Sequence, residues 1–317
     1  MHIQKVPGIH NAYGAGLCNG EIMSLVGSEP SVSVIIPTMA SLERESLLKR
    51  AVESIRSSSV QHICIIAVVN GARFDAGVCE WLKSQPDIQF HYSKTPSAPG
   101  AILRGRELVR TEFFSALDDD DEYLAGTTDQ KLAVLRADTQ ADLVVGNYYQ
   151  YCAGAESLRY DRLADVPAHP LESLMQFNWL SSGNALFRAE TVGVQYFNGY
   201  HDFAEWTLVA YRLAMDHKKV AILDTPVFRC YGETPGSLSK SDAYFAAYIP
   251  LFKRMLAFSP PKHVACMIHR KMGAAYHDAS VVANQNGFYK DAWKHHLQSL
   301  MKDGGLRYLS YTRHLIL

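Results

Sequence analysis

The stretch SVSVIIP, residues Ser31–Pro37, carries the clearest structural signal in this sequence. It is a short run rich in β-branched valine and isoleucine that a proline ends, a pattern typical of a buried strand. A helical segment over residues 47–55 follows, with its apolar residues on one face. A second apolar run, Ile63–Val69, then closes on the turn pair Asn70-Gly71. A strand, a helix and a strand in this order predict two neighbouring parallel strands.

The same alternation continues to about residue 150. Further strands are expected at Ile88–Tyr92, Phe113–Leu117 and Asp142–Gly146, and helices over residues 101–110 and 128–137. This spacing predicts an α/β fold, a mostly parallel sheet with helices on both faces. Ligands bind to such sheets beyond the carboxyl ends of the strands. Three turn sequences fall at those ends, namely Pro37-Thr38, Asn70-Gly71 and Asp118–Glu122.

The chain of 317 residues is long enough for one large or two unequal domains. We expect a glycine-rich, polar leader over residues 1–30, an α/β domain over 31–240 and a C-terminal helical extension over 241–317. An apolar stripe at helical spacing supports the extension: Phe288, Ala292, Trp293, Leu297, Leu300 and Met301. Gly304-Gly305 then ends that helix.

The charges are balanced overall but not along the chain. Thirty-one Lys and Arg oppose 32 Asp and Glu, which gives no reason to expect nucleic acid as a partner. Residues 251–317, however, hold ten basic and only three acidic residues, a net charge of +7 against −8 for residues 1–250. This basic region could contact an anionic membrane. The alternative is a helical cap or a homodimer surface with solvated charges.

The six cysteines are spread through the chain without a C-x-x-C pair, which argues against a disulfide framework and against a structural zinc site. No signal-peptide pattern is visible. The longest fully apolar run, Ile63–Val69, is too short to span a bilayer. The expected location is therefore the cytoplasm, with peripheral contact at the inner face of the membrane left open.

The acidic run DDDDE, Asp118–Glu122, follows directly on the apolar run Phe113–Leu117. Adjacent acids repel one another, and at a strand end they cannot all be solvated equally well. A divalent cation would relieve the repulsion, and carboxylate oxygens suit Mg²⁺ or Mn²⁺. Mg²⁺ usually completes its coordination with water and phosphates, so the run also suggests a nucleotide diphosphate. The alternative is a solvated acidic turn or a helix N-cap.

Four segments together resemble the inverting glycosyltransferases of family 2. They are SVSVIIPT (Ser31–Thr38), IIAVVNG (Ile65–Gly71), GAILRG (Gly100–Gly105) and SALDDDDEY (Ser115–Tyr123), in the order of that family. Three later segments extend the resemblance to about residue 241: SSGNALFRAETV (Ser181–Val192), EWTLVAYRL (Glu205–Leu213) and YGETPGSLSKS (Tyr231–Ser241). The resemblance implies a GT-A fold, a nucleotide-sugar donor (a UDP-, dTDP- or GDP-sugar) and Mn²⁺ or Mg²⁺ held by a D-x-D motif.

The resemblance also implies roles for individual residues. Donor-nucleotide contacts would come from Pro37, Thr38, Arg44, Asn70, Gly71, Arg104, Asp118 and Asp119. Metal ligands would come from Asp118, Asp120 and Asp121, and sugar contacts from Trp179, Gly183 and Asn184. Tyr231, Ser237 and Ser239 lie in a loop that could close over the diphosphate as a lid. The alternatives are that Trp179 is a core residue, that Gly183-Asn184 is a turn and that the loop is a connector.

This chain departs from the family at two positions. The family usually has Asp where this chain has Asn70, which keeps hydrogen-bonding atoms but loses the charge. Members also carry Glu-Asp shortly before an Arg-Leu pair, and here that position reads Glu205-Trp206. With Trp206 in the place of the catalytic base, Glu205 or Asp202 could replace it. Both could instead cap a helix, because Asp202-x-x-Glu205 is a capping-box pattern.

The resemblance therefore implies metal-dependent, inverting transfer of a sugar to a hydroxyl of a glycan or lipid-linked glycan acceptor, as in bacterial surface polysaccharide synthesis. Two alternatives stay open. A non-catalytic nucleotide-sugar-binding module would explain the missing Asp at position 206. A sugar-phosphate nucleotidyltransferase would use a similar sheet, but the G-x-G-T-R loop that it needs after its first strand is absent from the sequence.

Overall fold

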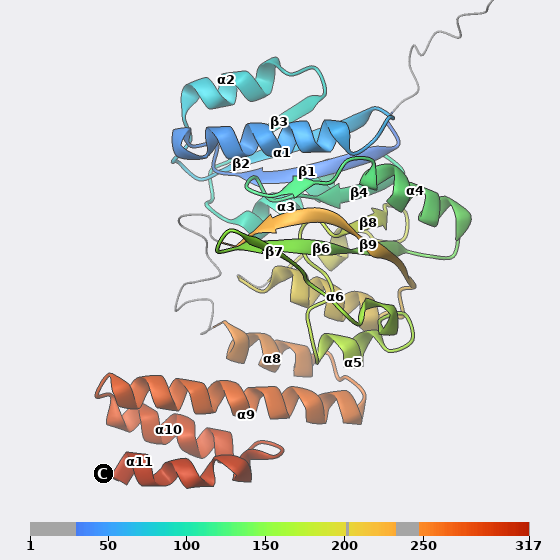
Figure 1. The fold of residues 1–317 in the computed structure, drawn as a ribbon. Helices are drawn as coiled ribbons and strands as arrows, with labels where there is room; N and C mark the ends of the chain where they lie inside the picture. Colours follow the sequence, from blue (N-terminus) through green and yellow to red (C-terminus); the bar gives the residue numbers. More distant parts are fainter. Residues whose placement is uncertain (1–29, 201–202, 233–246, 317) are drawn as a thin grey trace, which may run out of the picture.

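The computed structural model describes residues 30–200, 203–232 and 247–316. The expected leader over residues 1–30 lies outside this part except for its last residue. One sheet of nine strands forms the centre of the molecule, and helices cover both of its faces (Figure 1). Eight strands follow the order β3-β2-β1-β4-β8-β6-β9-β5, and β7 pairs with β6 at the side of this path. The α/β fold expected from the sequence is thereby confirmed.

The first half of the sheet is parallel and contains the predicted strand–helix units. Its strands are β1 (Val32–Thr38), β2 (Ile63–Asn70), β3 (Ile88–Ser93) and β4 (Phe113–Ala116). The helices between them are α1 (Glu45–Ser57), α2 (Ala76–Ser84) and α3 (Ala98–Leu108), with the short 3₁₀ turn η1 (Leu42–Arg44) before α1. The residue register places the carboxyl ends of β1, β2 and β3 side by side.

The second half of the sheet is mixed. β8 (Ala185–Arg188) lies antiparallel between β4 and β6 (Leu143–Cys152), and β9 (Val220–Tyr231) runs parallel to β6. β5 (Glu122–Tyr123) and β7 (Ala155–Leu158) are short antiparallel additions. The helical elements here are α4 (Thr127–Ala137), η2 (Leu163–Asp165), α5 (Pro170–Leu174), η3 (Val194–Tyr196) and α6 (Glu205–Met215).

Close packing of α3 against the sheet fixes the position of β1. A Cβ atom added at Gly105 of α3 would lie 2.3 Å from Cγ2 of Ile35, a distance that a side chain cannot occupy. Ile35 is fully buried, as are Ile65, Ile66 and Val68 on the neighbouring strand. Because both faces of these strands are covered, their sequences read as continuous apolar runs rather than as alternating patterns.

The C-terminal helical region is built from α8 (Tyr248–Ala257), α9 (Lys262–Gln285), α10 (Tyr289–Leu300), η5 (Gly305–Thr312) and α11 (Arg313–Ile316). Figure 1 shows these elements in successive layers beside the sheet domain. The Tyr211 hydroxyl of α6 donates a 2.8 Å hydrogen bond to the carbonyl oxygen of Met255 and ties α8 to that domain. Within the described residues, no helix is both long and apolar enough to cross a bilayer.

The apolar stripe predicted for α10 is only partly buried. Ala292 is fully buried, whereas Phe288, Leu297 and Met301 are 63%, 53% and 75% exposed. Helical spacing correctly predicted the helix but not which side of it is covered. The buried face of α10 is instead made by Ala292, His296 and Ser299.

Candidate active site at the carboxyl ends of the strands

The acidic run lies in the turn after β4, beside the end of β1. The Asp121 N–H donates to the carbonyl oxygen of Asp118 at 3.2 Å and closes this turn. The Thr38 hydroxyl at the end of β1 donates to Oδ2 of Asp119 at 2.6 Å and accepts from the N–H of Ala40. Because β1 and β4 are parallel neighbours, two turns distant in sequence meet at one edge of the sheet.

Arg44 neutralises two of the acids. Its Nε lies 3.1 Å from Oδ1 of Asp119, and its Nη2 lies 3.2 Å from Oδ2 of Asp120. Asp119 is only 5% exposed, so its charge needs this partner. Arg44 reaches the acids from η1, directly after the β1 turn. It thus holds the carboxyl ends of β1 and β4 together.

The other two aspartates are not balanced in the same way. Burial and then the negative charges of Asp120 and Glu205 raise the pKa of Asp118 to about 7. Burial and the charges of Asp118 and Asp120 also raise the pKa of Asp121, although the N–H of Tyr231 donates to its Oδ1 at 2.9 Å. Burial is the larger cause for both carboxyls, and the neighbouring negative charges add to it.

The donor set fits a divalent cation that has two protein carboxylates. The acidic run offers carboxylate oxygens, which are the ligands that Mg²⁺ and Mn²⁺ prefer. In the part of the chain that the structure describes, no three His, Cys, Asp or Glu side chains converge into a complete cation site. Phosphate oxygens of a substrate would therefore have to supply further ligands, as is usual for Mg²⁺.

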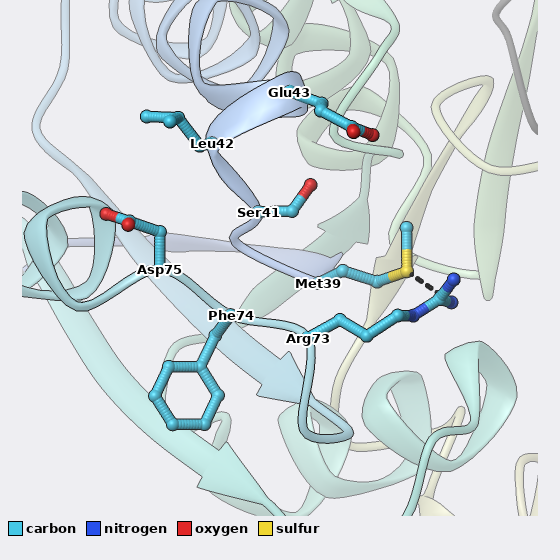
Figure 2. A pocket seen from close by; sticks show the side chains of 7 residues that line it. All are labelled: Met39, Ser41, Leu42, Glu43, Arg73, Phe74 and Asp75. Carbon is cyan, nitrogen blue, oxygen red and sulfur yellow. Dashed lines mark hydrogen bonds between the residues drawn. The ribbon is translucent and has the colours of Figure 1, made fainter.

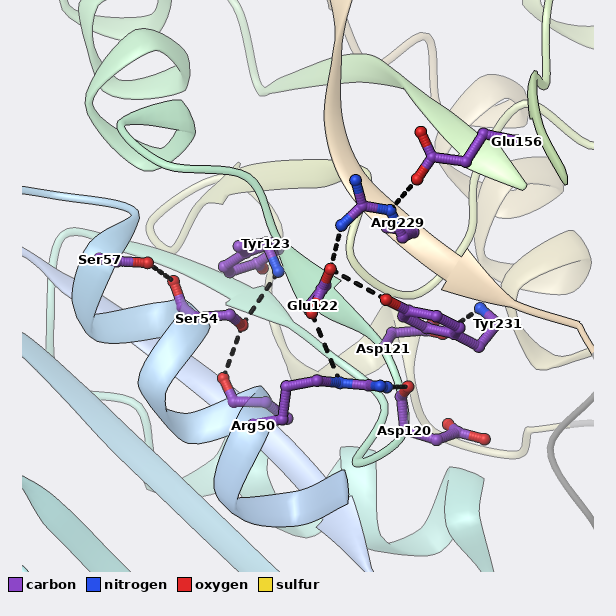
Figure 3. Close-up of polar contacts among 11 residues, drawn as sticks. Arg50, Ser54, Ser57, Asp120, Asp121, Glu122, Tyr123, Glu156, Arg229 and Tyr231 are labelled. Atoms are coloured by element: carbon purple, nitrogen blue, oxygen red, sulfur yellow. Dashed lines mark hydrogen bonds and ion pairs between the residues drawn. The ribbon is translucent and has the colours of Figure 1, made fainter. Parts of the chain in front are cut away.

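A second layer of charges holds the acidic run from the side of β9 (Figure 3). Arg50 of α1 contacts the carbonyl oxygen of Asp120, pairs with Glu122 at 3.4 Å and covers the Tyr231 ring, 4.0 Å from its centroid. The Tyr231 hydroxyl donates to Oε1 of Glu122 at 3.0 Å. Arg229 of β9 forms ion pairs with Glu122 and Glu156. Tyr231 was expected from the sequence in a lid loop, whereas here it is the last residue of β9, and Arg50 was not predicted.

Asn70 links the ends of two strands to the next helix. Its Nδ2 donates to the carbonyl oxygen of Thr38 at 3.0 Å, and its Oδ1 accepts from the N–H of Ser97 at 3.1 Å. Gly71 follows with a φ of +81°, and an added Cβ there would lie 3.0 Å from Pro96, so glycine suits this turn. The neutral amide of Asn70 thus connects β1 with the start of α3.

Arg104 was also predicted to contact the donor nucleotide, but no described contact brings it to the acids. It forms an exposed ion pair with Glu107 on α3, and its charge lowers the pKa of His91 after the larger effect of burial. Pro37 is fully buried within β1 and pairs with Val68 of β2 in the sheet register. Pro37 thus lies inside the strand, which continues through Thr38, rather than ending it.

A cavity of about 360 Å³ opens beside this site, between η1 and the loop after Gly71 (Figure 2). It is lined by Met39, Ser41, Leu42, Glu43, Arg73, Phe74 and Asp75. Arg73 reaches across it to within 2.8 Å of the Met39 sulfur. The sequence interpretation missed these residues, although their place after two predicted strand ends could have indicated them.

Glu205 is the first residue of α6 and lies close enough to Asp118 for its charge to raise the pKa of that carboxyl. Trp206, the next residue, packs in the core: it is 9% exposed, stacks on Phe187 and meets Phe197 edge to face. Ala204, not Asp202, occupies the N-cap position of the helix. Asp202 itself lies outside the described residues, as do Ser237 and Ser239.

The predicted sugar-contact residues form a buried support beneath the acidic run. Trp179 and Asn184 are fully buried, and the Asn184 amide donates to the carbonyl oxygen of Trp179 at 2.9 Å. The N–H of Gly183 donates to the carbonyl oxygen of Ala116 at the end of β4. The φ of Gly183 is +88°, and a Cβ there would lie 2.8 Å from the Phe228 ring. No side chain would fit at this position.

Lys131 of α4 lies in the same support and was not predicted. It is fully buried, and burial lowers its pKa to about 7. Its ammonium nitrogen lies 4.3 Å from the centroid of the Tyr123 ring and 3.5 Å from the carbonyl oxygen of Gly183. Lysine residues on helices are mostly exposed, so nothing in the sequence around Lys131 indicates that its side chain is buried.

Comparison with known proteins agrees with this geometry. The pattern of the family described as "Glycosyl transferase family 2" matches residues 33–201, more than half of the chain. No curated protein matches the chain in sequence. The chain belongs to glycosyl transferase family 2 and is a glycosyltransferase, as the sequence motifs indicated.

Solved structures of S. aureus TarS share the fold. Residues 1–349 of that protein in complex with UDP-GlcNAc give a TM-score of 0.57 at 12% identity, over 82% of this chain and 75% of that one. The complex with UDP gives a TM-score of 0.53 at 11% identity, over 82% and 74%. A longer TarS structure gives 0.54 at 11% identity, over 76% of this chain and 42% of that one. Together with the family match, these similarities confirm a GT-A fold with a C-terminal helical region.

Proposed function

We propose that this family 2 glycosyltransferase moves a sugar from a nucleotide-diphosphate donor to an acceptor hydroxyl with inversion, and that Mn²⁺ or Mg²⁺ assists it. The observation that carries the proposal is the acidic run itself. Two of its carboxyls have raised pKa values, while Thr38 and Arg44 hold it at the carboxyl ends of the strands. Asp120 and Asp118 are the proposed cation ligands, with Asp121 as a further candidate.

A nucleoside diphosphate suits the residues around the run. Asn70, Gly71 and Thr38 lie at adjoining strand ends, and Arg44 supplies a positive charge there. The two S. aureus TarS complexes hold UDP-GlcNAc and UDP, which supports a nucleotide-sugar donor for a chain of the same fold. We place UDP-, dTDP- and GDP-sugars as the donor candidates, because Asn70 replaces the usual Asp of the family.

The bound cation would supply a positive charge to the leaving diphosphate. Arg44 already balances Asp119 and Asp120, so it orients Asp120, one of the proposed cation ligands. Glu205 lies near Asp118 at the start of α6, where a carboxylate can take the proton of the acceptor hydroxyl as it attacks. Glu205 is the proposed base, and Asp202 is the second candidate.

Several further assignments belong to the same proposal. The acceptor is a glycan or lipid-linked glycan of a bacterial surface polysaccharide pathway, and the protein acts in the cytoplasm. Residues 31–240 form the catalytic domain, and residues 241–317 are an extension of it. Gly183 and its buried neighbours Trp179 and Asn184 shape the sugar site from below.

A thermal-shift panel tests the nucleotide and the cation together. The protein is melted with UDP, GDP, dTDP or CMP, each with and without Mn²⁺. We expect one nucleotide to raise the melting temperature more with Mn²⁺ than without it, and Asp120→Asn to lose that difference. Asp303→Asn, an exposed acid of the C-terminal region, is the matched control. The proposal is contradicted if none of the four nucleotides changes the melting temperature, with or without Mn²⁺.

A further inference from the structure

The described surface has one region in which large apolar side chains concentrate. Among exposed large apolar residues, the following lie between positions 282 and 316: Val282, Phe288, Tyr289, Leu297, Met301, Leu306, Leu309 and Ile316. The other 236 described residues, all before position 282, show only six, three of which (Leu42, Phe74 and Tyr92) lie around the cavity beside η1. Exposed apolar residues gathered in this way mark an interaction surface.

Basic side chains share this surface. Lys290, Lys294 and Leu297 of α10 and Met301, the C-cap residue of that helix, follow a spacing of four, three and four residues, which places them on one face, and all are exposed. In η5, Arg307 and Leu306 are neighbours on the outer side. Among the described residues, no carboxylate forms an ion pair with these three basic side chains.

The exposure does not come from a loose chain end, because η5 is anchored on its inner side. The Tyr308 ring stacks on His277 of α9 with centroids 4.3 Å apart. The Thr312 hydroxyl lies 2.8 Å from Nε2 of His296 in α10. With Tyr308 and Thr312 turned inward, Leu306 and Leu309 remain 76% and 56% exposed. The fold therefore holds apolar side chains toward solvent.

From these observations we propose that the outer face of α10 and η5 binds to the surface of a membrane that carries anionic lipids. A membrane interface takes up apolar side chains at the level of the headgroups and attracts the lysines and arginines beside them. A second copy of this chain, meeting the first through the same face, is a poorer occupant, since residues 251–317 carry a net charge of +7 and the two faces would repel each other. Nucleic acid would leave the leucines and methionine without an apolar partner.

Vesicle co-sedimentation of the full chain tests the proposal without any sugar donor, so its result is independent of the proposed reaction. We expect binding to vesicles of phosphatidylcholine mixed with phosphatidylglycerol, weaker binding at high salt and little binding to phosphatidylcholine alone. Lys290→Glu with Lys294→Glu should weaken binding to the mixed vesicles at least roughly 30-fold. Leu306→Ser with Leu309→Ser should weaken it as well, because the apolar contact is lost.

Two control pairs make the same changes elsewhere on the surface. Arg136→Glu with Lys219→Glu alters the net charge equally, and Val60→Ser with Leu158→Ser removes two exposed apolar residues remote from α10 and η5. Both pairs should bind vesicles like the unchanged protein. The proposal is overturned if the full chain does not bind mixed vesicles, or if test and control pairs weaken binding equally. A dimer in sedimentation velocity that Leu306→Ser with Leu309→Ser dissociates would instead make this face a self-association surface.

Discussion

The hydroxyl of Thr38 donates a 2.6 Å hydrogen bond to Oδ2 of Asp119, which lies 81 residues later in the chain. Thr38 is 2% exposed and Asp119 is 5% exposed, so the bond is shielded from water. A short bond from a hydroxyl to a buried carboxylate is strong, and it fixes the acidic turn against the end of β1. Asp119 is thereby committed to structure, which leaves Asp118, Asp120 and Asp121 for a ligand.

We expect Asp120→Ala to lower glycosyl transfer by about 10²–10³-fold, the loss typical when one electrostatic group of a transition state is removed. Its carboxylate faces Arg44 at 3.2 Å, so the variant also leaves that arginine with one partner, Asp119. Turnover is measured as nucleotide release across a series of Mn²⁺ concentrations. Asp303→Asn serves as the control, and unchanged turnover in Asp120→Ala would exclude Asp120 as a cation ligand.

For Glu205→Gln we expect transfer to fall by about 10²–10⁴-fold, the range for loss of a general base. The amide is nearly the same size, so nucleotide binding in the thermal-shift assay should be kept. Removing a negative charge near Asp118 should also lower the pKa of that carboxyl. Full turnover in the variant would exclude Glu205 as the base. Asp202→Asn would then be tested in the same way, because Asp202 is the second candidate.

The stability of the cation-free protein should fall as the pH rises toward neutrality. Burial and nearby charges raise the pKa of Asp118 from its ordinary 3.8 to about 7, so the folded protein holds this proton more tightly than the unfolded chain. The stability linked to this group is complete below 3.8 and is lost as the pH rises through about 7. Asp121 acts in the same direction because its pKa is also raised.

Melting temperatures measured in EDTA across this pH window check the sign. Asp118→Asn cannot ionise and should flatten the decline, whereas Asp291→Asn should not change it. Mg²⁺ should raise the melting temperature more above pH 7 than below it, since the ionised carboxyl is the ligand form. A cation-free protein whose stability rises steadily through this window would contradict the raised pKa of Asp118.

The sequence was informative where the chain is buried on both sides. β1 and β2 read as continuous apolar runs because covered strands need no polar face, and their bounds were predicted within one residue. β5 has two residues and β8 has four, which is too short for any periodicity. The register between β6 and β9 shifts near Gly146 and Asn147. At this shift β9 contains the polar residues Asp224 and Thr225, which interrupt its apolar pattern and hide the strand in the sequence.

Some residues of the candidate site could likewise be predicted from the sequence, and others could not. Adjacent acids are visible in any sequence, and the structure places Thr38, Arg44 and Asn70 next to or near them. Arg50 could not be predicted, because its contacts with Tyr231 and Asp120 exist only once α1, β9 and the acidic turn come together. Nothing in the local sequence distinguishes Arg50 from an ordinary exposed helical arginine.

The contact between Arg50 and Tyr231 should contribute measurably to stability. Tyr231→Phe keeps the ring over the guanidinium but loses the hydrogen bond to Glu122, which should cost about 1 kcal/mol in the free energy of unfolding. Tyr231→Leu also loses the cation–π contact and should cost about 0.5–2 kcal/mol more. Urea titrations, with Tyr289→Phe as an exposed control, measure both. Combining Tyr231→Leu with Arg50→Gln should give less than the sum of the single losses.

The sequence resemblance aligns Trp206 with the base of the family, yet its ring packs on Phe187 and Phe197 in the core. Introducing the family residue by Trp206→Asp should therefore not improve catalysis. It removes a large buried ring and places a carboxylate among aromatic side chains, and should lower the free energy of unfolding by at least about 3 kcal/mol. Trp206→Phe keeps an aromatic ring there and should retain most stability and turnover. Urea titration and nucleotide release on both variants decide the matter: a stable Trp206→Asp protein with faster transfer would show that position 206, not Glu205, is the place for the base.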